Sequence, residues 1–163
     1  MENVIKITEI RLVNTSDEIV WREMWSDYNA FYGALVPDKT TTSTWNRIID
    51  KESKIGALVA ICDGKPIGFA NYVLHDYSWS QGFACLMDDL FVIPKARGKG
   101  AAKLMIQTLI DMGHEHNWTR VYWMTREGNE TARKLYDKFC STDGFVRYTI
   151  ALDGIKPTAG NSE

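Results

Sequence analysis

The sequence lacks any hydrophobic run of the roughly 20 residues that a membrane-spanning helix needs. Its longest apolar run, Ile55 to Cys62, has only the length of a strand. Cysteine is also scarce, because Cys62, Cys85 and Cys140 are the only three in 163 residues, and no two of them form a Cys-x-x-Cys pair. These absences argue against a membrane protein, a disulfide framework and a structural zinc site, and they predict a reducing compartment.

An excess of charge of one sign is missing as well. The chain has 19 Lys and Arg against 21 Asp and Glu, a formal net charge of −2, which offers nucleic acid or an anionic membrane no general attraction. The N-terminus lacks the basic start and long apolar stretch of a secretion signal, so we expect a cytoplasmic protein. With 45% hydrophobic residues, the chain predicts one domain over residues 1–153 and a flexible tail over residues 154–163.

The first half of the chain predicts a strand, two helices and a hairpin. A strand is expected over residues 5–13, and Thr15-Ser16-Asp17-Glu18 has the form of a capping box that begins a helix ending at Gly33. Residues 34–44 are typical of a loop, and a short helix is expected around Trp45. Two β-rich runs then flank Asp63-Gly64-Lys65 and predict a hairpin of Ile55–Cys62 and Pro66–His75.

The second half predicts alternating strands and helices. Strands are expected over Phe83–Ile93, Val121–Thr125 and Phe145–Leu152, and helices over Gly100–His116 and after Asn129. Strands and helices arranged around one sheet indicate an α/β or α+β fold.

The clearest chemical signal lies between the expected strand at Phe83–Ile93 and the helix that follows. Small residues in the loop let a ligand approach the main chain, and the N–H groups at a helix start attract phosphate oxygens. Arg97 and Lys99 add positive charge there. The sequence therefore predicts a phosphate or pyrophosphate site at Arg97, Gly98, Lys99, Gly100, Ala101, Ala102 and Lys103.

Two common phosphate loops do not fit this segment, because it has no Gly-Lys-Ser/Thr ending and no third glycine of a dinucleotide fingerprint. The pattern that remains is Arg-Gly-x-Gly-x-Ala at residues 97–102. With it, the sequence resembles the GNAT family of acetyl-CoA-dependent N-acetyltransferases, whose pyrophosphate-binding loop has this form. Asn129 followed by Leu135-Tyr136 is similar to the family's second cofactor motif, and the Trp- and Tyr-rich first half looks like the histone and polyamine acetyltransferase branch.

The resemblance implies a mixed, strongly twisted sheet with helices on both faces, acetyl-CoA as co-substrate and no metal. It implies that the main chain of Leu90, Phe91 and Val92 pairs with the pantetheine arm and that Arg97 to Lys103 hold the pyrophosphate. Asn129 would contact the pantetheine, and Tyr136 would protonate the leaving thiolate. Since the family is often dimeric, the resemblance also implies a homodimer.

The acceptor side is less specific. Asp88-Asp89 stands where many members of this branch have Glu-Asp, and a carboxylate can bind an alkylammonium ion and accept its proton. Neighbouring residues of a strand point to opposite faces, so both can face the site only if the strand bulges. We favour Asp88, acting directly or through water. Tyr28 and Tyr32 either line a cation-accepting pocket or belong to the core.

We expect transfer of acetyl from acetyl-CoA to a primary amine by direct attack, with a polyamine, amino acid or amino sugar as acceptor. A protein lysine or N-terminal acetyltransferase is the enzymatic alternative. A non-catalytic acyl-CoA-binding module or a nucleotide-binding protein could use the same loop. Tyr136 as a core residue and Asn129 as a plain helix cap also remain open, and Cys85 is expected to be a buried thiol.

Overall fold

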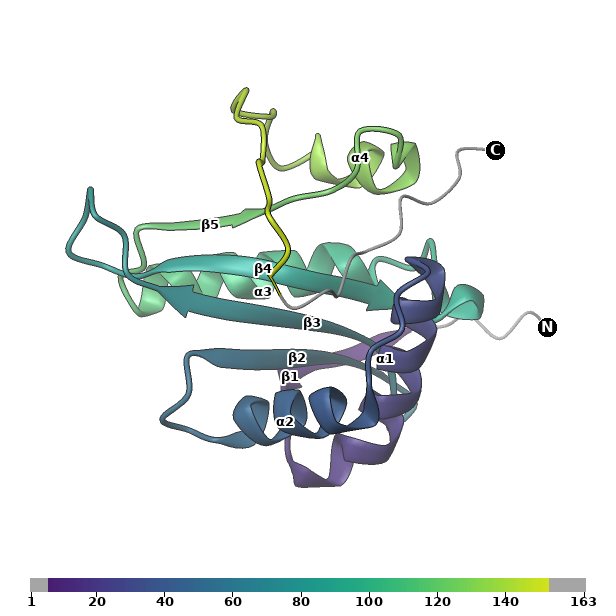
Figure 1. Cartoon of the computed structure of the whole chain (residues 1–163). Helices are drawn as coiled ribbons and strands as arrows, with labels where there is room; N and C mark the ends of the chain where they lie inside the picture. The colour runs from purple at the N-terminus through teal and green to yellow at the C-terminus, as the bar shows by residue number, and fades with distance from the viewer. Residues whose placement is uncertain (1–5, 153–163) are drawn as a thin grey trace.

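The protein folds around one mixed sheet, and the computed structural model describes residues 6–152. The five strands of this range lie in the order β1-β2-β3-β4-β5, all antiparallel except for β4 and β5, which run parallel (Figure 1). In chain order the elements are β1 (Ile7–Leu12), the 3-10 helix η1 (Thr15–Asp17), α1 (Glu18–Phe31), α2 (Asp38–Ile49), β2 (Ile55–Cys62), β3 (Lys65–His75), β4 (Ala84–Val92), the 3-10 helix η2 (Pro94–Ala96), α3 (Ala101–Glu115), β5 (Arg120–Trp123) and α4 (Glu130–Tyr136).

Helices cover both faces of the sheet, α1 and α2 on one side and α3 on the other (Figure 1). Beneath α1 and α2, Trp21 and Trp45 are buried against Phe69 of β3. Beneath α3, Met105 and Leu109 are fully buried in a second apolar layer. Two layers of helix on one mixed sheet confirm the predicted α/β fold. Within residues 6–152, no helix combines the length and the apolar character needed to cross a bilayer.

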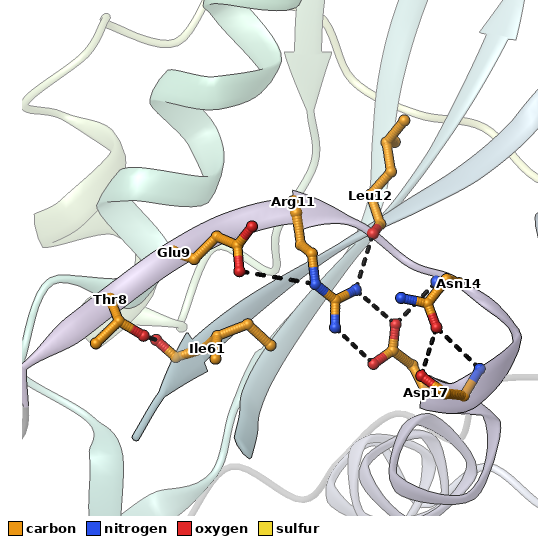
Figure 2. A network of polar contacts seen from close by, with 8 residues as sticks. Thr8, Glu9, Arg11, Leu12, Asn14, Asp17 and Ile61 are labelled. Carbon is orange, nitrogen blue, oxygen red and sulfur yellow. Dashed lines mark hydrogen bonds and ion pairs between the residues drawn. The ribbon is translucent and has the colours of Figure 1, made fainter. Parts of the chain in front are cut away.

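An ion pair fixes the chain between β1 and α1 (Figure 2). Both terminal nitrogens of Arg11 donate to the buried Asp17 carboxylate, at 2.7 and 2.9 Å, and hold the pKa of Asp17 below its ordinary value. Asp17 also accepts from the main-chain N–H of Asn14 at 2.8 Å, and the Asn14 side chain accepts from the Ser16 N–H at 2.9 Å. The capping box therefore begins at Asn14, so the predicted start at Thr15 was wrong by one residue.

The segment between the first two helices is shorter than predicted. Residues 38–44, expected to be a loop, form the first half of α2. Pro37 precedes the first turn, and the Thr41 hydroxyl accepts from Trp25 Nε1 at 3.2 Å. Trp45 and Ile48 bury the inner face of the helix. This packing outweighs the weak helix propensity of a threonine-rich sequence.

The β2–β3 hairpin is confirmed. Asp63 and Gly64 form its two-residue turn with φ of 49° and 74°, the left-handed conformation that the Asp-Gly signal predicts. The expected strand over Phe145–Leu152 is wrong, because the segment pairs with no strand of the described chain. Its apolar side chains are exposed, from 76% at Val146 to 94% at Leu152. A strand needs a neighbouring edge as well as an alternating pattern. The predicted tail at 154–163 lies outside the described residues.

Candidate active site

The strand β4 separates from β5 halfway along its length. Only Ala84–Met87 pair with β5, where Met87 lies opposite Trp123. On the other side, β3 continues to pair, but the register shifts: Asn71 lies opposite Asp89 and Tyr72 opposite Met87. Asp88 is therefore the extra residue of a β-bulge. Neighbouring residues of a regular strand point to opposite faces, and a bulge of this kind is what allows both aspartates to face one site.

Beyond the bulge, part of the β4 main chain faces an edge without a strand partner. The N–H of Ile93 donates to the Ile67 carbonyl of β3 at 3.0 Å. Because main-chain groups alternate along a strand, those of Phe91 also face β3, whereas those of Leu90 and Val92 face the open edge. Three residues were expected to pair with pantetheine, and two of them, Leu90 and Val92, thus have main-chain groups that face the open edge.

The loop after β4 has the shape that a phosphate ligand requires. Gly98 and Gly100 adopt φ of 74° and 90°, which a residue with a Cβ rarely does, and nothing lies within 4 Å of a Cβ placed on either one. Gly100 precedes α3 without a side-chain cap, so the first N–H groups of this helix have no partner from within it. Arg97 lies beside the loop, and its Nε donates to the Val92 carbonyl at 3.0 Å.

Asp89 lies in a polar network beneath α1. It accepts from Asn71 Nδ2 at 3.0 Å and from the Tyr28 hydroxyl, while the Asn71 side-chain oxygen accepts from Trp21 Nε1 at 3.2 Å. Burial and the neighbouring Asp88 raise the pKa of Asp89 to about 6, although both donors oppose the rise. This network fixes one carboxylate that titrates close to neutral pH.

Asp88 differs from its neighbour. It is exposed at the surface, where the surrounding protein still displaces enough water to raise its pKa, and the positive charge of Arg147 opposes the rise. The bulge therefore presents one fixed carboxylate, Asp89, and one that solvent reaches, Asp88.

Three tyrosines gather beside these carboxylates. Tyr28 and Tyr32, one turn apart on α1, have ring centroids 5.0 Å apart. Tyr136, the last residue of α4, packs on Trp123 with centroids 5.5 Å apart. Burial, and to a smaller extent Tyr32, raises the pKa of Tyr136 to about 12, so this hydroxyl keeps its proton at neutral pH. Arg126 lies over the Tyr32 ring, with its Cζ 5.1 Å from the centroid.

Asn129 has a local partner for each side-chain group. Its Oδ1 accepts from the Ala132 N–H at 3.3 Å, and its Nδ2 donates to the Thr125 hydroxyl at 3.2 Å. It thus caps α4 in this structure, as the plain reading of the sequence allowed.

The thiol of Cys85 is fully buried, and burial raises its pKa to about 12, so it is no thiolate nucleophile. Residues 6–152 contain no group of three or more His, Cys, Asp or Glu side chains placed to hold a metal ion.

Sequence reasoning identified the loop and both aspartates but missed Asn71 and Arg126. Asn71 reaches Asp89 only through the pairing of β3 with β4, and Arg126, in the loop after β5, reaches Tyr32 at the end of α1. The one available signal was Asn71 itself, a polar residue within the otherwise apolar run of the second hairpin strand.

This arrangement, a glycine loop at the end of an open strand edge with two carboxylates at the bulge, is the one expected of an acyltransferase. The model of the acetyltransferase (GNAT) family matches residues 21–141, and the chain belongs to this family. Among curated proteins it is similar to D-amino-acid N-acetyltransferase HPA3 of Saccharomyces cerevisiae, with 34% identity over 85% of this chain and 88% of the relative. The protein is a GNAT-type N-acetyltransferase.

Solved structures show the same fold. The ribosomal-protein-alanine N-acetyltransferase from Brucella melitensis superposes with a TM-score of 0.73 and 24% identity, over 88% of this chain and 98% of that one. The aminoglycoside acetyltransferase AAC(6')-Iy, solved with the bisubstrate analog CoA-S-monomethyl-acetylneamine, superposes with a TM-score of 0.76 and 21% identity, over 88% and 97%. At these identities the likeness extends to the fold alone. The matches include several kinds of acceptor and do not single out the histone and polyamine branch.

Proposed function

We propose that this protein transfers the acetyl group of acetyl-CoA to the primary amine of a small molecule by direct attack. The observation that carries the proposal is the open edge of β4, which lies between the glycine loop and the carboxylate and tyrosine cluster. Acetyl-CoA supplies an activated thioester there. The main-chain groups of Leu90 pair with its pantetheine arm, the Val92 N–H faces its thioester carbonyl, and the loop from Arg97 to Lys103 holds its pyrophosphate.

The acceptor amine has to lose a proton before it attacks. An alkylammonium ion with a pKa of about 10.4 costs roughly 4.6 kcal/mol to deprotonate at pH 7. Asp88, which solvent reaches, accepts this proton directly or through water, and Asp89 binds the ammonium ion from its fixed position. Tyr28 and Tyr32 form the aromatic wall of the acceptor pocket.

The nitrogen then forms a bond to the acetyl carbon as the carbon–sulfur bond breaks. The Val92 N–H, which faces the open edge, donates to the oxygen that gains charge. Tyr136 gives its proton to the departing sulfur and recovers one from the acceptor side. Its raised pKa suits this role, because the hydroxyl is fully protonated at neutral pH.

Three kinds of small acceptor fit this description: an amino acid, an amino sugar or a polyamine. The similarity to a D-amino-acid N-acetyltransferase supports an amino acid. A protein lysine or N-terminus is the second candidate, supported by the fold shared with a ribosomal-protein-alanine N-acetyltransferase. A module that only binds acyl-CoA has no need of the polar network around the half-buried Asp89 or of a protonated Tyr136.

Two further features belong to the proposal. Buried free thiols at Cys62 and Cys85 support a reducing, cytoplasmic location. The exposed apolar side chains of residues 145–152 support a homodimer that would cover them. Sedimentation equilibrium tests this directly: a twofold mass supports the dimer, and a monomer at micromolar concentration rejects it.

Release of free CoA thiol from acetyl-CoA tests the proposed activity. Polyamines, amino acids, amino sugars and lysine peptides are supplied as separate pools. Thiol release above the background without amine, with any of the three small-molecule pools, supports the proposal. Release with peptides alone moves the assignment to a protein acceptor. Binding of CoA without release from any pool favours the non-catalytic module.

A further inference from the structure

A positively charged and a negatively charged side chain are linked by a series of contacts beside the bulge in β4. Arg126, in the loop between β5 and α4, lies over the Tyr32 ring. Tyr32 packs edge-on against Tyr28, and the Tyr28 hydroxyl donates to Asp89. A guanidinium and a carboxylate are therefore in contact with the two members of a single aromatic pair.

The electrostatics agree with this placement. Burial raises the pKa of Tyr32; the positive charge of Arg126 opposes this rise and the negative charge of Asp89 adds to it, so both charges act on the same hydroxyl. A second cation lies nearby: the positive charge of Arg147 opposes the rise that burial causes in the pKa of Asp88, and Arg147 Nη1 is 3.9 Å from the sulfur of Met124, just after β5. This region thus has two carboxylates from the bulge in β4 and two arginines from the chain after β5.

We infer that Arg126, assisted by Arg147, binds the carboxylate of an amino-acid acceptor while Asp88 and Asp89 hold its ammonium group. The inference rests on the proposed acetyl transfer and narrows its substrate class. In an amino acid one carbon atom separates the two charged groups, so both must be met within one small pocket. The planar guanidinium group suits a carboxylate, which it can bind through two parallel hydrogen bonds.

The same charges disfavour the other small acceptors. A polyamine carries only positive charge, so its distal ammonium groups are repelled by Arg126 and Arg147. An amino sugar offers hydroxyl groups in place of a carboxylate, and a guanidinium binds these more weakly than it binds an anion. Arg126 therefore acts as a specificity determinant, and the reacting groups are Asp88 and Tyr136.

The test compares acceptors that differ only at the carboxylate. Leucine, in either enantiomer, and leucinamide share one side chain and one amine, and CoA thiol release gives kcat/KM for each. We expect the better leucine enantiomer to exceed leucinamide by roughly 10- to 100-fold, as for other hydrogen bonds to charged groups. In Arg126→Gln this preference should fall to within roughly threefold, and Arg126→Lys should recover part of it.

Arg120→Gln is the matched control. It replaces an arginine by glutamine at the first residue of β5, whereas Arg126 follows the other end of that strand. It should retain the full preference for leucine. Equal rates with leucine and leucinamide in the wild type, or an unchanged preference in Arg126→Gln, would overturn the inference. Both results leave the proposed acetyl transfer intact, because thiol release still occurs.

Calorimetric binding of N-acetylleucine separates carboxylate recognition from turnover. Loss of binding in Arg126→Gln but not in Arg120→Gln supports the inference even if no acceptor is acetylated. Equal binding to all three proteins contradicts it. A wild type that binds N-acetylleucine but releases no thiol with any amine would refute the proposed function alone.

Discussion

The two halves of β4 have the same neighbour on one side and different surroundings on the other. Ala84–Met87 pair with β3 and with β5, and Ala84, Cys85 and Met87 are buried. Asp89–Val92 pair with β3 alone, and no strand of residues 6–152 pairs with their other edge. One extra residue, Asp88, lies where the first half ends and the second begins.

The difference shows how one strand can stabilise the fold and also bind a ligand. In the closed half the strand has β3 on one side and β5 on the other, which ties β5 to the core. In the open half, the main-chain groups of Leu90 and the N–H of Val92 face an edge that no strand of residues 6–152 covers, while the Val92 carbonyl accepts from Arg97 Nε. The bulge there places Asp89 beside Tyr28. A site built on a strand that β3 holds rigid needs little rearrangement when a ligand binds.

The largest difference between the halves is expected from paired tyrosine substitutions. Tyr136→Phe, at the open half, removes the proposed acid and should lower kcat about 100-fold. Tyr122→Phe, in the closed half, removes a hydroxyl that contacts His75 at 2.9 Å and should leave kcat within roughly threefold of the wild type. Steady-state rates with CoA affinity measured in parallel check both. Unchanged kcat in Tyr136→Phe would mean that this residue is not the acid.

The β3 side of the open half should be intolerant of added volume. A Cβ on Gly68 would lie 2.7 Å from the Phe91 carbonyl, so Gly68→Ala should lower the free energy of unfolding by about 1–3 kcal/mol. Gly113→Ala in α3, whose Cβ would approach no atom closer than 3.4 Å, should raise it by up to about 1 kcal/mol. Urea denaturation of both variants shows the expected opposite signs. Equal stability would mean that β3 and β4 separate as easily as β4 and β5.

The glycine loop should couple backbone strain to ligand binding. Gly100→Ala and Gly64→Ala both place a side chain at positive φ in open space, and each should cost about 1–2 kcal/mol of stability. Only Gly100→Ala should also weaken CoA binding, by roughly tenfold. Calorimetric titration with CoA separates the two, and an equal loss of affinity in Gly64→Ala would indicate a general effect of instability.

The smallest effect is expected from the half-buried carboxylate of Asp89. The pKa of Asp89 is raised from 3.8 to about 6 in the folded protein, so its ionisation opposes folding as pH rises through this window. Asp89→Asn removes this cost and should raise the free energy of unfolding by about 1 kcal/mol or less at pH 8. Thermal unfolding at pH 8 and pH 4 checks the sign, since the gain should shrink towards pH 4. A gain that grows on acidification would contradict the assignment.

Features that depend on neighbouring residues in the sequence were predictable. The Asp63-Gly64 turn, the glycine loop and the apolar face of α3 each follow from residues within a few positions of one another. The bulge at Asp88 was predictable only as a condition, because nothing in the local sequence decides whether a strand takes an extra residue.

The remaining features depend on distant contacts. Asn71 bonds to Asp89 only because β3 pairs with β4, and Arg126 lies over Tyr32 only because the fold brings the loop after β5 to the end of α1. The helix at residues 38–44 exists because Thr41 and Trp45 pack against α1, which outweighs local propensity. The segment at 145–152 has the pattern of a strand, but its structure depends on whether an edge is available to it.

The central claim is that the open half of β4 receives the pantetheine arm. Amide hydrogen exchange at single-residue resolution, with and without CoA, tests it most directly. The account predicts added protection at the N–H groups of Leu90 and Val92 and no change at Phe91 or Cys85, which already pair within the sheet. Protection that is unchanged at Leu90 and Val92 in the presence of saturating CoA would contradict it.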